Sequence, residues 1–134
     1  MIALLNEELG WDIVANELVK RENQFFAHSI NLCEVYYDFI KAGLHAGLDD
    51  KAAEETASKA IDDLQKIKIM PRTDMDEPFW KQVGQLKAQL RKISLADCHV
   101  IALAQTLNAV ILTSDRKEFT PVRDAGLCRV EFIR

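Results

Sequence analysis

Apolar residues recur at helical spacing in five stretches of the chain, with polar residues at the positions between them. The expected helices cover residues 10–23, 30–44, 53–64, 79–90 and 95–107. Ahead of the fourth, Asp74, Asp76 and Glu77 precede Pro78, which is a helix-start signature because proline suits the first helical turn. The last helix begins after Ser94 and is apolar nearly all round.

Short apolar runs between these helices predict strands. The expected strands are "QFFAHS", "IKIMPR", "NAVILTSD" and "LCRVEFIR". Pro71 is expected to close the second of them, and Gly43, Gly47 and the Asp49–Asp50 pair punctuate the loop between the second and third helices. Strands that alternate with helices, and that are apolar on both faces, imply a parallel sheet covered by helices. The sequence therefore predicts an α/β domain.

Length and composition favour one ordinary globular domain over residues 1–134. The chain has 134 residues, of which 49% are hydrophobic and 28% charged, and no repeat or Pro/Gly-rich linker divides it. No apolar run approaches the length of a membrane span, and the N-terminus lacks the pattern of a signal peptide. We therefore expect a cytoplasmic protein that does not enter a membrane.

The cysteines, histidines and net charge exclude several classes of site. Cys33, Cys98 and Cys128 are far apart and form no C-x-x-C pair, so they suit reduced packing residues better than a disulfide framework or a zinc site. The three histidines show no metal-ligand spacing. A net charge of -4 argues against a surface that coats nucleic acid broadly. A small cleft that handles phosphate through a bound metal remains compatible with it.

Asp97 lies beside the most apolar residues of the last expected helix. On a helix it shares a face with Val100 and Ile101, three and four residues later. Burying a carboxylate there without water costs roughly several kcal/mol of free energy unless a charged or hydrogen-bonding group contacts it. Ser94-x-x-Asp97 can be a capping box, in which the serine caps the helix and Asp97 reaches back. The group that contacts the Asp97 carboxylate is therefore either the capping serine or a bound metal ion.

Two more carboxylates occupy comparable positions. Asp115 follows the expected strand Ala109–Thr113 directly, where ligands bind in open α/β sheets, although a turn aspartate is the simpler interpretation. Glu34 lies among apolar residues early in its helix, and Asn31-x-x-Glu34 can be another capping arrangement. Helix starts and strand ends can meet at one edge of a sheet. Carboxylates gathered there repel one another unless a cation joins them, and oxygen ligands suit Mg²⁺ or Mn²⁺.

The segments "SINLCEV", "ISLADCHVIALAQ" and "AVILTSDRKEF" resemble the acidic motifs of PIN-domain ribonucleases, which include the toxins of many bacterial toxin–antitoxin pairs. The resemblance implies a three-layer α/β/α sandwich with a central, mainly parallel sheet. It also implies that Glu34, Asp97 and Asp115 bind Mg²⁺ or Mn²⁺ and hydrolyse RNA phosphodiester bonds. Thr113 and Ser114 match a polar pair that holds a water at such a site.

The same resemblance extends to supporting residues and partners. We expect Asn31 to support Glu34. From their nearness in sequence to Asp115, we expect Arg116, Lys117 and Arg123 to contact RNA phosphate, although such residues are more often simply solvated. Family members further imply an RNA substrate, an antitoxin protein and a homodimer.

The departure from the family lies at the front of the chain. Members begin with a short apolar strand that ends in an aspartate, and "MIALLNEELG" resembles only the helix that follows it. Glu7, Glu8 and Asp12 are expected to face solvent and do not take over the missing role. An N-terminally truncated copy should be a weak or inactive nuclease. A start codon assigned about ten residues too late would explain the gap, in which case the full-length protein is the active endoribonuclease; a decayed copy is the alternative.

Two other functions compete with the nuclease. A catalytically inactive PIN-like binding module would associate with a partner protein or with itself through aromatic side chains such as Tyr37 and Trp80, although such residues are more often core. A phospho-acceptor signalling module is disfavoured, because it needs paired acids after its first strand and a lysine after its last. Metal-dependent RNA cleavage separates the nuclease from both.

Overall fold

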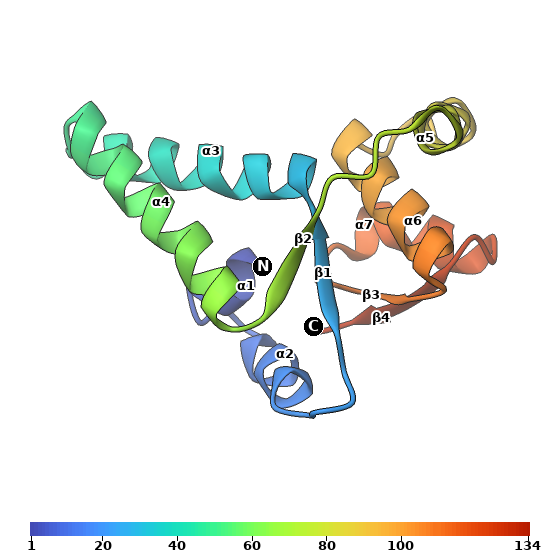
Figure 1. The fold of residues 1–134 in the computed structure, drawn as a ribbon, viewed down its shortest axis with the longest axis horizontal. Coiled ribbons are helices and arrows are strands. Elements are labelled where there is room, and N and C mark those ends of the chain that lie inside the picture. Colours follow the sequence, from blue (N-terminus) through green and yellow to red (C-terminus); the bar gives the residue numbers. More distant parts are fainter. The chain divides into compact units, whose positions relative to one another are not determined.

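The computed structural model describes residues 1–134 and comprises two compact units, Met1–Arg72 and Thr73–Arg134. The first contains α1 (Ile2–Leu5), α2 (Trp11–Leu18), β1 (Phe25–His28), α3 (Ser29–His45), α4 (Asp50–Lys66) and β2 (Ile69–Arg72). The second contains α5 (Glu77–Gln89), α6 (Leu95–Leu107), β3 (Val110–Thr113), α7 (Arg116–Asp124) and β4 (Arg129–Phe132). Figure 1 colours the first unit from blue to green and the second from yellow to red. Each unit is described in turn.

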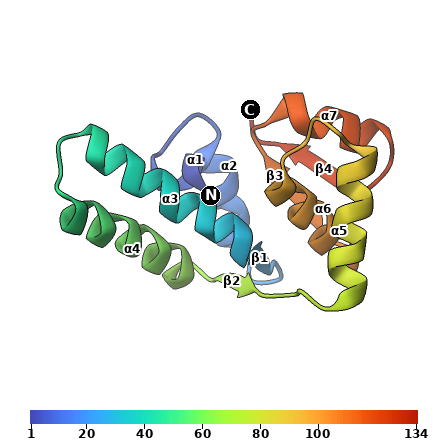
Figure 2. The same cartoon turned by 90° about the horizontal axis from the view of Figure 1, so that it is seen from above.

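In the first unit, α3 and α4 form a long helical hairpin, and they lie side by side in both views (Figures 1 and 2). The face that α4 buries carries alanines at helical spacing, so the two backbones can approach closely. Gly43, which we expected in the loop, instead lies buried inside α3, where a Cβ atom would be 3.1 Å from Cβ of Ala53. The loop prediction was wrong at this position because Gly43 serves packing between the helices.

The strands of the first unit pair in parallel, with Phe25 opposite Ile69 and His28 opposite Arg72. Pro71 lies within β2 and does not close it, which a strand with one partner tolerates because proline removes only one donor. The core of this unit is formed by buried Ala27, Val35, Leu64 and Ile69, with partly buried apolar side chains of α1, α2, α3 and α4 packed around them.

The start of α3 follows β1 without a loop. His28 is the N-cap, and its Nδ1 accepts the backbone N–H of Ile30 at 3.2 Å. The Ser29 hydroxyl donates to the backbone oxygen of Arg72 at 2.7 Å and so ties the beginning of α3 to the end of β2. The helix expected over residues 10–23 is shorter than predicted, since α2 ends at Leu18.

In the second unit, α5 begins where the sequence indicated. Asp76 caps it by accepting the N–H of Phe79 at 3.1 Å, and Pro78 lies in the first turn. The predicted apolar stripe is confirmed at Phe79, Val83 and Leu86, which are buried. The tightly packed helix of this unit is α6, whose start is capped by Ser94.

The strands β3 and β4 also pair in parallel, with Val110 opposite Arg129 and Thr113 opposite Phe132. The α/β class and parallel pairing are therefore confirmed, and the strands pair two by two within the units. Burial on both faces was the wrong expectation for β4, because Arg129 and Glu131 are exposed while Val130 between them is buried.

Helix α7 was not predicted. It buries Phe119 and Val122 although it contains Pro121, which lacks a backbone N–H. Among the helices of both units, none is long and apolar enough to span a bilayer.

Candidate functional site

Asp97 occupies the third position of α6 and is held by the residue that caps the helix. The Ser94 hydroxyl accepts the backbone N–H of Asp97 at 3.0 Å and donates to Oδ2 of Asp97 at 2.6 Å. The carboxylate is half-buried. A hydroxyl group therefore meets Asp97, and of the two capping-box contacts the one from the Asp97 N–H to the Ser94 side chain is present.

Asp115 lies at the carboxyl end of β3 and is the N-cap of α7. Its Oδ1 accepts the N–H of Glu118 at 2.9 Å, and its own N–H donates to Oγ1 of Thr113 at 3.1 Å. The side chain is exposed. Asp115 therefore has the local role of a turn and cap residue, at the sheet position where ligands bind in α/β folds.

Glu118 connects these two aspartates within the second unit. Its Oε2 accepts the backbone N–H of Ser94 at 3.2 Å, across 24 residues of sequence. A path of three hydrogen bonds thus runs from Asp97 through Ser94 and Glu118 to Asp115. Sequence reasoning missed Glu118, although Asp115-x-x-Glu118 followed by Phe119 is itself a helix-start pattern.

The charges at the start of α6 act on the neighbouring thiol. Burial raises the pKa of Cys98, and the negative charges of Asp97 and Glu118 raise it further, while Lys87 opposes them. The Lys87 ammonium donates to the backbone oxygens of Arg91 and Ile93 and so fixes the turn that leads to α6. Both carboxylates therefore lie close enough to the buried thiol to influence its ionisation.

Glu34 lies in the first unit, in the second turn of α3, and is exposed. Because His28 is the N-cap, the capping arrangement considered for Asn31 and Glu34 is not the one that starts this helix. Asn31 is buried in the first turn, 5% exposed. Of the acids near the N-terminus, Glu7 and Asp12 are exposed as expected, whereas Glu8 is half-buried.

The basic side chains next to Asp115 are partly ordered by an aromatic ring. The guanidinium carbon of Arg116 lies 4.6 Å from the centroid of Phe132, and that of Arg123 lies 5.3 Å from it. Nε of Arg116 also donates to the backbone oxygen of Arg134 at 2.7 Å. Lys117 is exposed. A stacked guanidinium loses less conformational freedom when it binds an anion.

Thr113 and Ser114, the polar pair before Asp115, also take part in hydrogen bonds. Thr113 accepts from Asp115 as described, and the Ser114 hydroxyl lies 3.4 Å from Nη2 of Arg134. These contacts place both hydroxyls at the carboxyl end of β3, on the same short segment as Asp115.

The oxygen donors of this region have the chemistry that a hard divalent cation prefers. One carboxylate oxygen of Asp97 accepts from the cap residue Ser94, and one of Asp115 caps α7. Neither unit by itself gathers three or more His, Cys, Asp or Glu side chains closely enough to hold a metal ion.

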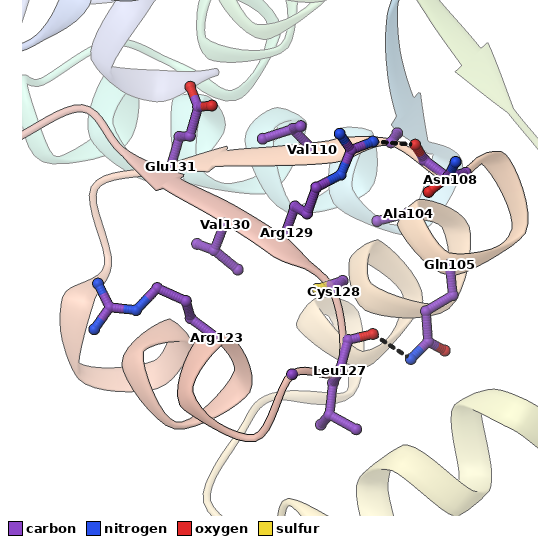
Figure 3. Close-up of a pocket in the computed structure, with 12 residues that line it drawn as sticks. Ala104, Gln105, Asn108, Val110, Arg123, Leu127, Cys128, Arg129, Val130 and Glu131 are labelled. Atoms are coloured by element: carbon purple, nitrogen blue, oxygen red, sulfur yellow. Dashed lines mark hydrogen bonds between the residues drawn. The ribbon is translucent and has the colours of Figure 1, made fainter.

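An open pocket of about 750 Å³ lies elsewhere in the second unit, around the residues that lead into β3 and β4 (Figure 3). Gln105 donates to the backbone oxygen of Leu127 at 2.8 Å, and Arg129 donates to that of Asn108 at 2.6 Å. These polar groups hold the pocket's own walls. Because the pocket adjoins the amino ends of the strands, it is separate from the Asp115 end of β3.

Comparison with known proteins gives matches to a protein family and to solved structures. A family model described as the PIN domain matches residues 1–124, a range that includes parts of both units. A solved structure described as VapBC-1 from nontypeable Haemophilus influenzae is similar with a TM-score of 0.62 and 21% sequence identity, over 98% of this chain and 90% of that chain. No curated protein gives a significant match. The structural likeness confirms the predicted PIN-like α/β fold.

Proposed function

This chain belongs to the PIN-domain family, and on that premise we propose that it is a metal-dependent endoribonuclease, the toxin of a toxin–antitoxin pair. One observation carries the proposal most directly. Asp97 and Asp115, from different elements, lie at helix starts joined through Ser94 and Glu118, and Asp115 follows a parallel strand. Carboxylates at the carboxyl end of a parallel strand suit a site for a phosphate ligand and its cation.

Glu34, Asp97 and Asp115 would hold the ion, which we propose is Mg²⁺ or Mn²⁺. When bound, it would activate water as the nucleophile and stabilise charge on the leaving oxygen. The chain's own residues would orient the components. Thr113 and Ser114 would position a water beside Asp115, and Asn31, buried one turn before Glu34, would support α3 at that point.

RNA binding in this proposal falls to Arg116 and Lys117. Arg116 is the better supported, because Phe132 holds its guanidinium beside the residue that would bind metal. Contacts of this kind go to phosphate oxygens, so they position a strand without selecting its sequence.

Turnover by this chain is expected to be weak. The resemblance implies Glu34, Asp97 and Asp115 and a further aspartate that has no counterpart in this sequence. Neither unit alone completes a ligand set. We further propose a cytoplasmic protein, with an antitoxin as partner and a homodimer as the assembly. The likeness to VapBC-1 and the family match support the antitoxin as partner.

The test combines metal binding with cleavage. Mn²⁺ would be titrated into the protein by calorimetry, and a fluorogenic RNA would report cleavage with and without EDTA. Asp97→Asn keeps an acceptor for the Ser94 hydroxyl but removes the charge, so metal-dependent cleavage should fall about a hundredfold. Asp62→Asn, which changes an exposed carboxylate on α4, is the matched control. Cleavage by Asp97→Asn at the unaltered rate would remove Asp97 from the site.

The competing function is a catalytically inactive binding module. Its support is the incomplete ligand set in each unit together with exposed apolar side chains, among them Leu9 at 77% and Val19 at 78% exposure. No cleavage at any Mn²⁺ concentration, combined with a concentration-dependent dimer in sedimentation, would favour this function over the nuclease.

A further inference from the structure

The capping boxes at the starts of α6 and α7 are incomplete when each helix is considered alone. In a capping box, the side chain at the third helical position accepts the backbone N–H of the cap residue. At α6 that position is Asp97, whose Oδ2 accepts instead from the Ser94 hydroxyl. The Ser94 N–H donates to Glu118 of α7 at 3.2 Å. A residue of another helix therefore completes the α6 box.

Helix α7 shows the complementary arrangement. Glu118 is its third residue, but its carboxylate does not accept the N–H of the cap residue Asp115, because that N–H donates to Thr113 at 3.1 Å. The Glu118 side chain is thereby directed to α6. It is half-buried, and its neighbour Phe119 is buried at 3% exposure, which anchors the first turn of α7.

We infer that Glu118 is a positioning residue that fixes the first turns of α6 and α7 against each other, and through them Asp97 relative to Asp115. The hydrogen bond from Ser94 is charge-assisted and partly shielded from water, so it is stronger than a bond between neutral groups on the surface. The consequence for metal binding rests on the proposed function. The geometric consequence, that the Ser94 N–H depends on Glu118, does not.

Two substitutions separate positioning from metal ligation. Glu118→Gln keeps an oxygen that accepts the Ser94 N–H but removes the negative charge, whereas Glu118→Ala removes the acceptor. Amide hydrogen exchange of Ser94, followed by NMR, should accelerate about tenfold in Glu118→Ala and change little in Glu118→Gln. Mn²⁺ affinity should fall about tenfold in Glu118→Ala and be largely retained in Glu118→Gln. Glu131→Gln and Glu131→Ala, at an exposed site on β4, are the matched controls.

Each outcome supports or overturns the inference. Unchanged Ser94 exchange in Glu118→Ala would overturn the contact itself. An equal loss of Mn²⁺ affinity in both variants would make Glu118 a metal ligand and overturn the positioning role. Retained Mn²⁺ affinity in Glu118→Ala, with lower thermal stability, would reduce Glu118 to a purely structural residue. If the unaltered protein binds no Mn²⁺ and cleaves no RNA, the proposed function fails, while Ser94 exchange still decides whether Glu118 holds the two helices together.

Discussion

In the first unit, Glu34 lies in the second turn of a helix that His28 caps, whereas in the second unit Asp97 and Asp115 lie at helix starts and take part in the capping hydrogen bonds. The acid of the first unit is therefore separate from the interactions that begin its helix. The acids of the second unit belong to them. Truncation of Asp97 or Asp115 must be expected to change local structure as well as charge, whereas truncation of Glu34 leaves the capping hydrogen bond at His28 in place.

The two units also differ in how their helices pack. In the first, α4 presents alanines to Gly43 of α3, so contact is made by small side chains and backbone. In the second, α6 buries the larger side chains Ile101 and Leu103 as well as alanines. Close backbone packing tolerates added volume poorly, while a core of larger side chains is sensitive to volume removed. This contrast leads to the predictions below, from the largest expected effect on stability to the smallest.

Removing core volume from either unit should cost the most. Leu64→Ala in the first unit and Ile101→Ala in the second each truncate a fully buried side chain, so each should lower the free energy of unfolding by about 2–5 kcal/mol. Each unit contains one of the chain's two tryptophans, Trp11 and Trp80, so fluorescence of single-tryptophan variants in urea reports each unit separately.

The single-domain prediction requires both fluorescence signals to shift together in either variant. If Leu64→Ala shifted only the Trp11 transition, the units would be separate folding domains. Leu44→Ala removes a side chain that is 42% exposed and is the control for truncation at the surface.

Replacing two helical glycines by alanine should change the free energy of unfolding in opposite directions. Gly84 on α5 has open space where a Cβ atom would lie, so Gly84→Ala should raise the free energy of unfolding by about 0.5–1 kcal/mol through helix propensity. Gly43→Ala gains the same propensity but places Cβ 3.1 Å from Cβ of Ala53, so it should be destabilising. Urea unfolding measures both.

The reason for the Gly43 effect can be checked separately. Adding Ala53→Gly to Gly43→Ala removes the facing methyl group and should recover part of the lost stability. Equal stabilisation by Gly43→Ala and Gly84→Ala would show that the α3–α4 contact has room for a methyl group.

The reactivity of the three cysteines should differ between the units, and replacing them should have the smallest effect on stability. Cys33 on α3 is exposed, whereas burial raises the pKa of Cys98 and of half-buried Cys128. Ellman's reagent at neutral pH should therefore modify Cys33 first and Cys98 last, and Cys33→Ser should remove only the fast phase. Fast modification of Cys98 would mean that the start of α6 opens readily.

The same pKa shifts predict the pH dependence of stability. A thiol whose pKa is higher in the folded state contributes its full stabilisation below its unfolded pKa and loses it as the pH rises through the folded value. Stability should therefore decline slightly in alkaline solution, and replacing Cys98 by Ala should flatten that decline.

Much of the fold could be predicted because its signals are local. Asp76 with Pro78, and Ser94 with Asp97, marked helix starts that the structure confirms. Gly43 was misread because glycine marks loops by conformation and helix contacts by size, and sequence alone does not say which applies. The missed helix α7 contains a proline, and only its buried face outweighs the hydrogen bond that Pro121 cannot make.

The candidate site was less accessible to sequence reasoning. Asp97 and Asp115 were found because each lies at a predicted element boundary. Glu118 was not found, because its importance comes from a contact with Ser94, 24 residues away, that no periodicity encodes. The grouping of Glu34 with the two aspartates stays a prediction.

The cap at α7 determines how Asp115 should be probed. Pro121 leaves this nine-residue helix one backbone hydrogen bond short, so its beginning relies on the Asp115 side chain. Truncation to alanine would unravel that turn and disturb Glu118 along with any coordination, and a loss of activity would be ambiguous. The isosteric amide Asp115→Asn, an equally favourable cap residue, changes the charge alone and gives the interpretable result.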